Sequence, residues 1–171
     1  MPRIKNFPLS LIMFFLLFIL CLGTTLHAQT INNQNCKDIA TKLMSETIKI
    51  KKIHRQMTNA IGVPVNGKES KTYPRIDRFN RHVNILIHNL GVRVGSMKGL
   101  IEEAKQEGKI CQEMARKISS KVNAMKEIYV NMGLSLENPD TSGSKLFDLN
   151  KNLEQQANGT NSELQIAVKN F

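Results

Sequence analysis

Apolar residues recur at alternating spacings of three and four along most of this chain, and such spacing predicts amphipathic α-helices. The clearest run has nine positions in register: Ile76, Phe79, Val83, Leu86, Leu90, Val94, Met97, Ile101 and Ala104. Pro74 suits the first turn of this helix, and Gly108 marks its end. We therefore expect one long helix here, packed through a single apolar face.

Three further segments have the same periodicity, and strand patterns are nearly absent. The segment of about 36–61 follows a cap signal, Asn35 with Asp38, and ends at Gly62 and Pro64. Its stripe is Ile39, Leu43, Ile50, Ile53 and Met57, with Ile48 beside it. The next stripe is Cys111, Met114, Ile118, Val122, Met125, Tyr129 and Met132, closed by Gly133. The last, in about 145–171, is Leu146, Leu149, Leu153, Ala157, Leu164 and Ala167 or Val168. The chain is therefore predicted to be all-α, a four-helix bundle.

The lengths of the connections leave the order of helix directions open. The second and third helices are joined by two or three residues around Gly108, so they are antiparallel neighbours. The first and last connections have about 13 and 11 residues and reach roughly 43 and 36 Å when extended. A helix of 25 residues is roughly 38 Å long. Both up-up-down-down and up-down-up-down connectivity are therefore allowed.

The first 28 residues have the pattern of a secretory signal peptide. Arg3 and Lys5 precede an apolar stretch, 11–23, and a polar segment of small residues ends at Ala28. Thirteen apolar residues are too few to span a bilayer comfortably. We expect cleavage after Ala28, a mature helical domain of residues 29–171, and a secreted protein that is not inserted in a membrane.

Positive charge is in excess over the mature chain. The full sequence has 24 Lys and Arg against 14 Asp and Glu, and the signal peptide removes two basic residues, which leaves +8. Lys49, Lys51, Lys52 and Arg55 form a basic run that is a candidate site for heparan sulfate. Such runs more often form a solvated helix face. Nucleic acid is not an expected partner, because the chain lacks an aromatic platform on which bases could stack.

Two cysteines, Cys36 and Cys111, remain after the signal peptide with Cys21 is removed. In an oxidising compartment they form one disulfide by default. An up-up-down-down bundle places them at opposite ends, tens of ångströms apart, where they cannot be joined. An up-down-up-down bundle places both at one end. The state of this pair therefore tests the connectivity.

No pattern of catalytic, metal-binding or cofactor-binding residues is visible. The mature chain has three histidines, His54, His82 and His88, and no two are four residues apart on a helix. The enzyme class therefore has no positive support. A non-signalling carrier or scaffold for an apolar ligand remains an alternative, because the eight methionines of the chain could line an adaptable core.

The segment from Pro139 to Gly143, followed by Phe147 and by a chain end at Phe171, resembles the C-terminal portion of leukaemia inhibitory factor-type cytokines of the interleukin-6 family. The helix ends at 61–64 and 132–134 also resemble those of this family. The resemblance implies an up-up-down-down, long-chain cytokine bundle, a growth factor that binds and clusters cell-surface receptors. Those receptors are a shared signal-transducing chain and a chain like the leukaemia inhibitory factor receptor. We expect a monomer.

In this family a Phe and a Lys three residues later contact the second receptor. Phe147 matches the first position, while the second is Asn150, with Lys151 one residue on. The resemblance therefore implies Phe147, Asn150 and Lys151 as receptor-binding residues. Asn158 begins the one glycosylation sequon and lies close to three helical turns after Phe147, so a glycan there would share its face.

Overall fold

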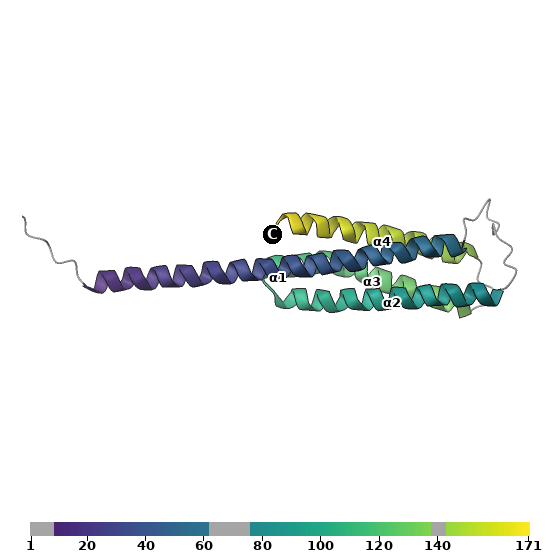
Figure 1. The fold of residues 1–171 in the computed structure, drawn as a ribbon, viewed down its shortest axis with the longest axis horizontal. Helices are drawn as coiled ribbons and strands as arrows, with labels where there is room; N and C mark the ends of the chain where they lie inside the picture. The colour runs from purple at the N-terminus through teal and green to yellow at the C-terminus, as the bar shows by residue number, and fades with distance from the viewer. Residues whose placement is uncertain (1–8, 62–75, 138–142) are drawn as a thin grey trace, which may run out of the picture.

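The computed structural model of the chain consists of α-helices joined by short segments (Figure 1). The helices are α1 (Leu9–Ile61), α2 (Ile76–Gln106), α3 (Lys109–Glu137) and α4 (Gly143–Lys169). The structure describes the backbone of residues 9–61, 76–137 and 143–171, and the side chains of residues 34–61, 80–137 and 144–171. No strand occurs in those backbone ranges, so the predicted all-α four-helix class is confirmed.

Two of the predicted helix boundaries are wrong. We expected the first helix to begin near Cys36, but α1 is continuous from Leu9, and the Asp38 carboxylate accepts a bond from the Gln34 side chain instead of capping a helix start (3.1 Å). We expected the third helix to end at Gly133, but α3 continues to Glu137. A helical glycine costs about 1 kcal/mol relative to alanine. The one further turn after Gly133 buries Ser135 and partly buries Leu136 against the core, which offsets that cost.

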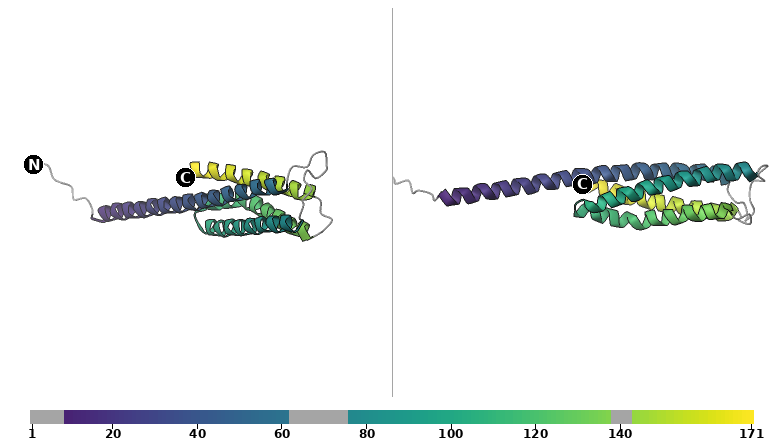
Figure 2. Two further views of the ribbon diagram at one scale, coloured as in Figure 1. Left: turned by 45° about the vertical axis from the view of Figure 1, so that its right-hand side comes forward. Right: turned by 90° about the horizontal axis from the view of Figure 1, so that it is seen from below.

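Neighbouring helices are antiparallel throughout the bundle. His54, near the end of α1, bonds to Asn150, near the start of α4, and Lys121 early in α3 approaches Glu163 late in α4 (4.0 Å). The α1 and α3 helices run one way, and α2 and α4 run the other way (Figures 1 and 2). Each helix packs on two neighbours, and α1 and α3 lie on a diagonal with few contacts. The connectivity is therefore up-down-up-down.

The predicted up-up-down-down connectivity is wrong, and the length of α3 explains why. The continuation of α3 to Glu137 leaves only five residues, 138–142, before α4 begins at Gly143. Five residues reach at most about 18 Å, whereas the 29 residues of α3 extend over about 44 Å. The connection cannot return along the bundle, so α4 must begin at the end where α3 stops.

The core lies along the shared axis of the helices, and most of the predicted stripes form it. All five predicted stripe residues of α1 are buried, as are those of α2 from Val83 to Ala104. Ile76 and Phe79 lie outside the described side chains. In α3, Tyr129 is only partly buried, as are Leu149, Ala167 and Val168 in α4. Ile48 was expected beside the core and is instead 60% exposed, because Thr47 and Ile50 fill the inward positions on either side of it.

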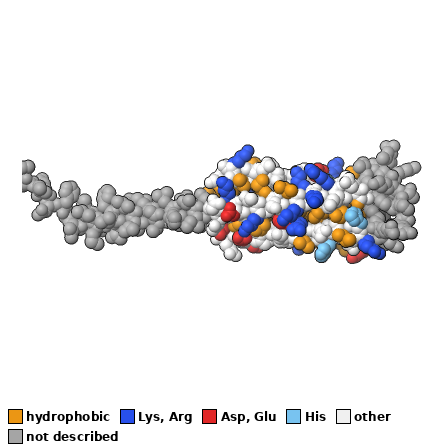
Figure 3. All heavy atoms as spheres, viewed as in Figure 1, with side chains coloured by type: hydrophobic (Ala, Val, Ile, Leu, Met, Phe, Trp, Pro, Cys, Tyr) orange, Lys and Arg blue, Asp and Glu red, His pale blue; other side chains and the backbone are white. Residues whose placement is uncertain are grey.

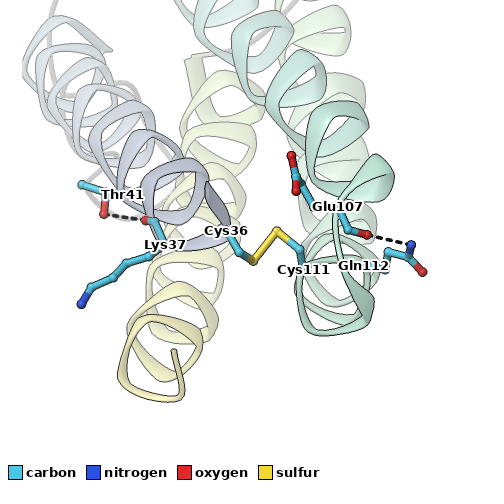
Figure 4. The surroundings of a disulfide bond; sticks show 6 residues. All are labelled: Cys36, Lys37, Thr41, Glu107, Cys111 and Gln112. Carbon is cyan, nitrogen blue, oxygen red and sulfur yellow. Dashed lines mark hydrogen bonds between the residues drawn. A yellow bond between two sulfur atoms is a disulfide. The ribbon is translucent and has the colours of Figure 1, made fainter. Parts of the chain in front are cut away.

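A disulfide joins Cys36 of α1 to Cys111 of α3 across the diagonal of the bundle (Figure 4). Their Cα atoms are 5.4 Å apart, and both side chains are almost fully buried. This is the pairing that up-down-up-down connectivity allows and up-up-down-down connectivity forbids. The bond ties together two helices that otherwise touch little, at the end of the bundle where α2 turns into α3.

Replacing both cysteines, Cys36→Ala with Cys111→Ala, should lower the free energy of unfolding by about 4 kcal/mol on the chain-entropy model, because the bond closes a long loop in the unfolded chain. Urea unfolding followed by circular dichroism measures this change, with the wild type under a reducing agent as the control. An unchanged urea midpoint, or peptide mapping that finds two free thiols in the wild type, contradicts the assignment.

Candidate functional site

The three predicted receptor contacts lie near the start of α4, in different surroundings. Lys151 is exposed, whereas Phe147 is partly buried and packs against the core. Asn150 is only 1% exposed. The prediction that Asn150 contacts a receptor is therefore wrong, because its side chain is enclosed by the bundle. Phe147 is one turn from Asn150 and so lies toward the same side of α4, next to α1.

Asn150 is the centre of a polar contact between α1 and α4. Its amide Nδ2 donates to the Thr58 hydroxyl (2.9 Å) and to the backbone carbonyl of His54 (3.2 Å). The Nδ1 atom of His54 lies 3.0 Å from the backbone oxygen of Asn150 and 3.1 Å from its Oδ1. Both oxygens can only accept, so Nδ1 carries the hydrogen and donates. The His54 side chain is only 13% exposed.

The four residues of the candidate heparan sulfate site lie along the two edges of the outward face of α1. Lys49 is salt-bridged to Glu46 (2.6 Å), and Glu46 also meets Arg93 of α2 (3.5 Å), so Lys49 lies toward α2. Lys52 is one turn further on that side. Because His54 faces α4, Lys51 and Arg55 lie toward α4. The structure therefore brings the four together as two short rows.

These rows lie on an open surface. Lys52 and Arg55 are exposed, Lys51 is partly exposed and the Lys49 side chain is 47% exposed. Figure 3 shows Lys and Arg side chains gathered over the part of the bundle where α1 lies in front of α3. From Lys49 to Arg55 the helix rises only about 9 Å. We call Lys49, Lys51, Lys52 and Arg55 the basic surface of α1.

The sequon residue Asn158 is exposed on α4, while the side chain of Thr160 is fully buried. The Thr160 hydroxyl donates to the carbonyl of Gln156 one turn earlier (2.8 Å). An exposed Asn158 side chain offers a glycan room outside the bundle. Glycosylation stays a prediction.

A cleft of about 80 Å³ lies between the start of α3 and the end of α4. Ile110, Ile166 and Phe171 provide its apolar rim, with Lys117 and Glu163 beside them. It is smaller than the roughly 150 Å³ cavity that accepts benzene in an engineered protein, and a lipid chain is larger still. This cleft therefore does not support the carrier alternative.

Two further features are absent from the described part of the chain. Within it, no group of three or more His, Cys, Asp and Glu side chains is arranged to hold a metal ion. No helix among the described residues combines the length and apolar character needed to cross a membrane.

Sequence reasoning missed the polar contact around Asn150, although a signal for it exists. Asn150 lies four residues after Leu146 and three before Leu153, which are both buried, so a polar residue interrupts an apolar stripe. A polar side chain in such a position needs a partner on a facing helix. Glu46, which is 8% exposed between Leu43 and Ile50, carries the same signal. Neither partner, His54 nor Arg93, can be identified from spacing alone.

No protein family, curated protein or solved structure matches this chain.

The variant Asn150→Ala should lower the free energy of unfolding by about 1–3 kcal/mol, because it leaves buried groups on α1 without their partners. Urea unfolding measures the change, and Asn152→Ala, an exposed asparagine of the same helix, is the matched control. Equal midpoints for the two variants contradict a structural role for Asn150.

Proposed function

We propose that this protein is secreted and binds sulfated polysaccharides of the cell surface through the basic surface of α1. The observation that carries the proposal is the grouping of four cations within about two turns of one outward helix face. No Asp or Glu occurs between residues 47 and 61, so no acidic side chain of this stretch of α1 opposes them. A cation cluster of this kind attracts a polyanion.

The surroundings of the basic surface favour an external partner. Glu46 is the nearest carboxylate on α1, and it is largely buried and already meets Lys49 and Arg93. On the α4 side Glu154 meets His54 (3.7 Å). Lys52 and Arg55 are exposed and make no salt bridge of 4.0 Å or less among the described contacts. Arg93 lies beside the surface and extends the positive charge onto α2.

An extracellular location favours a sulfated polysaccharide over nucleic acid as the polyanion that this surface binds. The disulfide is a bond that persists in oxidising compartments, and the N-terminal sequence has the signal-peptide pattern. Sulfated polysaccharides are the abundant polyanions outside cells. With no Trp and few aromatic residues, the chain offers little on which bases could stack.

Reversing two charges, Lys52→Glu with Arg55→Glu, should weaken binding to immobilised heparin at least about tenfold. Two attractions become repulsions, each worth roughly 0.5–1 kcal/mol at a surface. Surface plasmon resonance over a range of salt concentrations measures the dissociation constant, which should also become less sensitive to salt.

The matched control is Arg116→Glu with Lys126→Glu, which changes the net charge equally on α3, diagonally across the bundle. An equal loss in both variants means that net charge alone drives binding and overturns the proposed site. Binding to anionic vesicles in the absence of heparin binding also contradicts the polysaccharide assignment.

A second candidate function is receptor binding as a helical cytokine, and one observation favours it. Phe147 is a large aromatic side chain that the bundle covers only in part, close to exposed Lys151. Aromatic side chains of this kind often anchor protein interfaces. The resemblance implied a different connectivity from the observed one, so this candidate rests on Phe147 and not on the fold.

The variant Phe147→Ala should abolish most activation of a reporter in cells carrying the shared receptor chain of the interleukin-6 family, while the helical circular dichroism stays intact. The matched control is Phe171→Ala, another partly buried aromatic residue of the C-terminal segment. No response to the wild type, or equal responses to both variants, removes this candidate.

A further inference from the structure

The outward face of α2 has an unusual composition for this highly charged protein. Arg81, Glu102 and Glu103 are exposed near its two ends, whereas the charged residues between them, Arg93 and Lys98, are only partly exposed and flank the outward face, with 40% of the Arg93 side chain exposed. Two residues of the outward face are aliphatic and more than half exposed: Ile85 (54%) and Val92 (51%). The right-hand view of Figure 2 looks onto this side of the bundle.

The residues of this face are spaced for packing against another helix. Ile85, His88, Val92, Gly95 and Gly99 follow one another at intervals of three and four, on the side of α2 opposite its buried stripe. Such spacing forms a seam between two helices. No side chain or neighbouring backbone comes within 4 Å of a Cβ built at Gly95 or Gly99, so the surface is open there. We call these five residues the α2 seam.

The two halves of the α2 seam differ in size and in the charge beside them. The half nearer the start of α2 has the larger side chains, Ile85, His88 and Val92, and Arg81 precedes it. The other half has only glycines, and Glu102 and Glu103 follow it. If a second copy of α2 packs antiparallel on this face, the large residues of each copy lie opposite the glycines of the other, and Arg81 lies opposite Glu102 and Glu103. If the second copy is parallel, large residues lie opposite large residues and equal charges lie opposite each other.

We propose that two copies of this chain form a symmetric dimer through their α2 seams, with the helices antiparallel and the twofold axis close to Val92. The α2 seam is self-complementary, as an isologous interface must be. The five residues of the α2 seam carry no Lys, Arg, Asp or Glu, because Arg93 and Lys98 lie to the sides of it, so two basic molecules can approach along the seam itself. The glycines allow the helix axes to come close together. This dimer replaces the monomer that we expected from the sequence.

Other exposed aliphatic residues do not share these properties. Ile48 is isolated among polar residues of α1, Val130 and Leu134 project from α3, and Ile110 and Ile166 line the cleft between α3 and α4. None of them has an open glycine row facing it with opposite charges at the two ends. They therefore serve as controls.

Sedimentation equilibrium of the protein purified from the medium of expressing cells tests the dimer. The wild type should show a concentration-dependent exchange between monomer and dimer. The variant Val92→Lys, which places a charge in the centre of the α2 seam, should raise the dissociation constant at least about tenfold. The control Leu134→Lys, at an equally exposed aliphatic residue of α3, should leave it unchanged.

Engineered cysteines test the antiparallel arrangement. Ile85→Cys and Gly99→Cys molecules should form a disulfide with each other when mixed. Ile85→Cys alone should not form a covalent dimer, because its two copies would be about 20 Å apart along the helix axes.

A wild type that remains monomeric at every concentration overturns the proposal, as does a dimer that Val92→Lys does not weaken. Efficient covalent dimers of Ile85→Cys alone would show parallel pairing and also overturn it. Loss of vesicle binding in Val92→Lys, with a monomeric wild type, would assign the α2 seam to lipid instead.

Discussion

A connection of five residues cannot return along a helix of 29, and this limit of length fixes the direction of α4 relative to α3. Because α4 must begin where α3 ends, these two helices are antiparallel, and the contact of His54 with Asn150 makes α1 antiparallel to α4 as well. The same arrangement brings Cys36 to Cys111 and His54 to Asn150. A bundle with long crossing connections could not join Cys36 to Cys111, which would lie at its opposite ends.

Polar side chains inside the bundle then define how the helices are aligned along their axes. The contact of Asn150 with His54 and Thr58 satisfies donors and acceptors of both α1 and α4 in one arrangement. Glu46 and Arg93 make a similar contact between α1 and α2. Apolar stripes tolerate a slip of one turn, whereas a buried amide or carboxylate that slips loses its partners. Alignment therefore depends on a few polar residues.

Sequence reasoning predicted the helices and most of the core, because periodicity is a local property. It failed where a long-range contact decides the outcome. Gly133 looks like a helix end, yet packing beyond it continues α3, and those extra residues change the permitted connectivity. The burial of Asn150 depends on His54, 96 residues away.

The candidate sites could be predicted to different degrees. The basic surface of α1 could be identified from the sequence as a cluster, because its residues are near one another along one helix. The salt bridge that partly occupies Lys49 and the self-complementary α2 seam could not be identified in this way. The first depends on how α2 packs on α1, and the second depends on which side of α2 faces away from the core.

The disulfide encloses some of the helices in a covalent ring of the chain and leaves α4 outside it. It closes a ring of the chain that contains nearly the whole bundle portion of α1, all of α2 and the start of α3, whereas α4 lies outside this ring. Detachment of α4 therefore leaves the ring intact, and it releases the Asn150 contact without breaking a bond. A segment outside such a ring is free to open as a separate local unit, which would expose the inner surface of α4 while the ring keeps the other helices together.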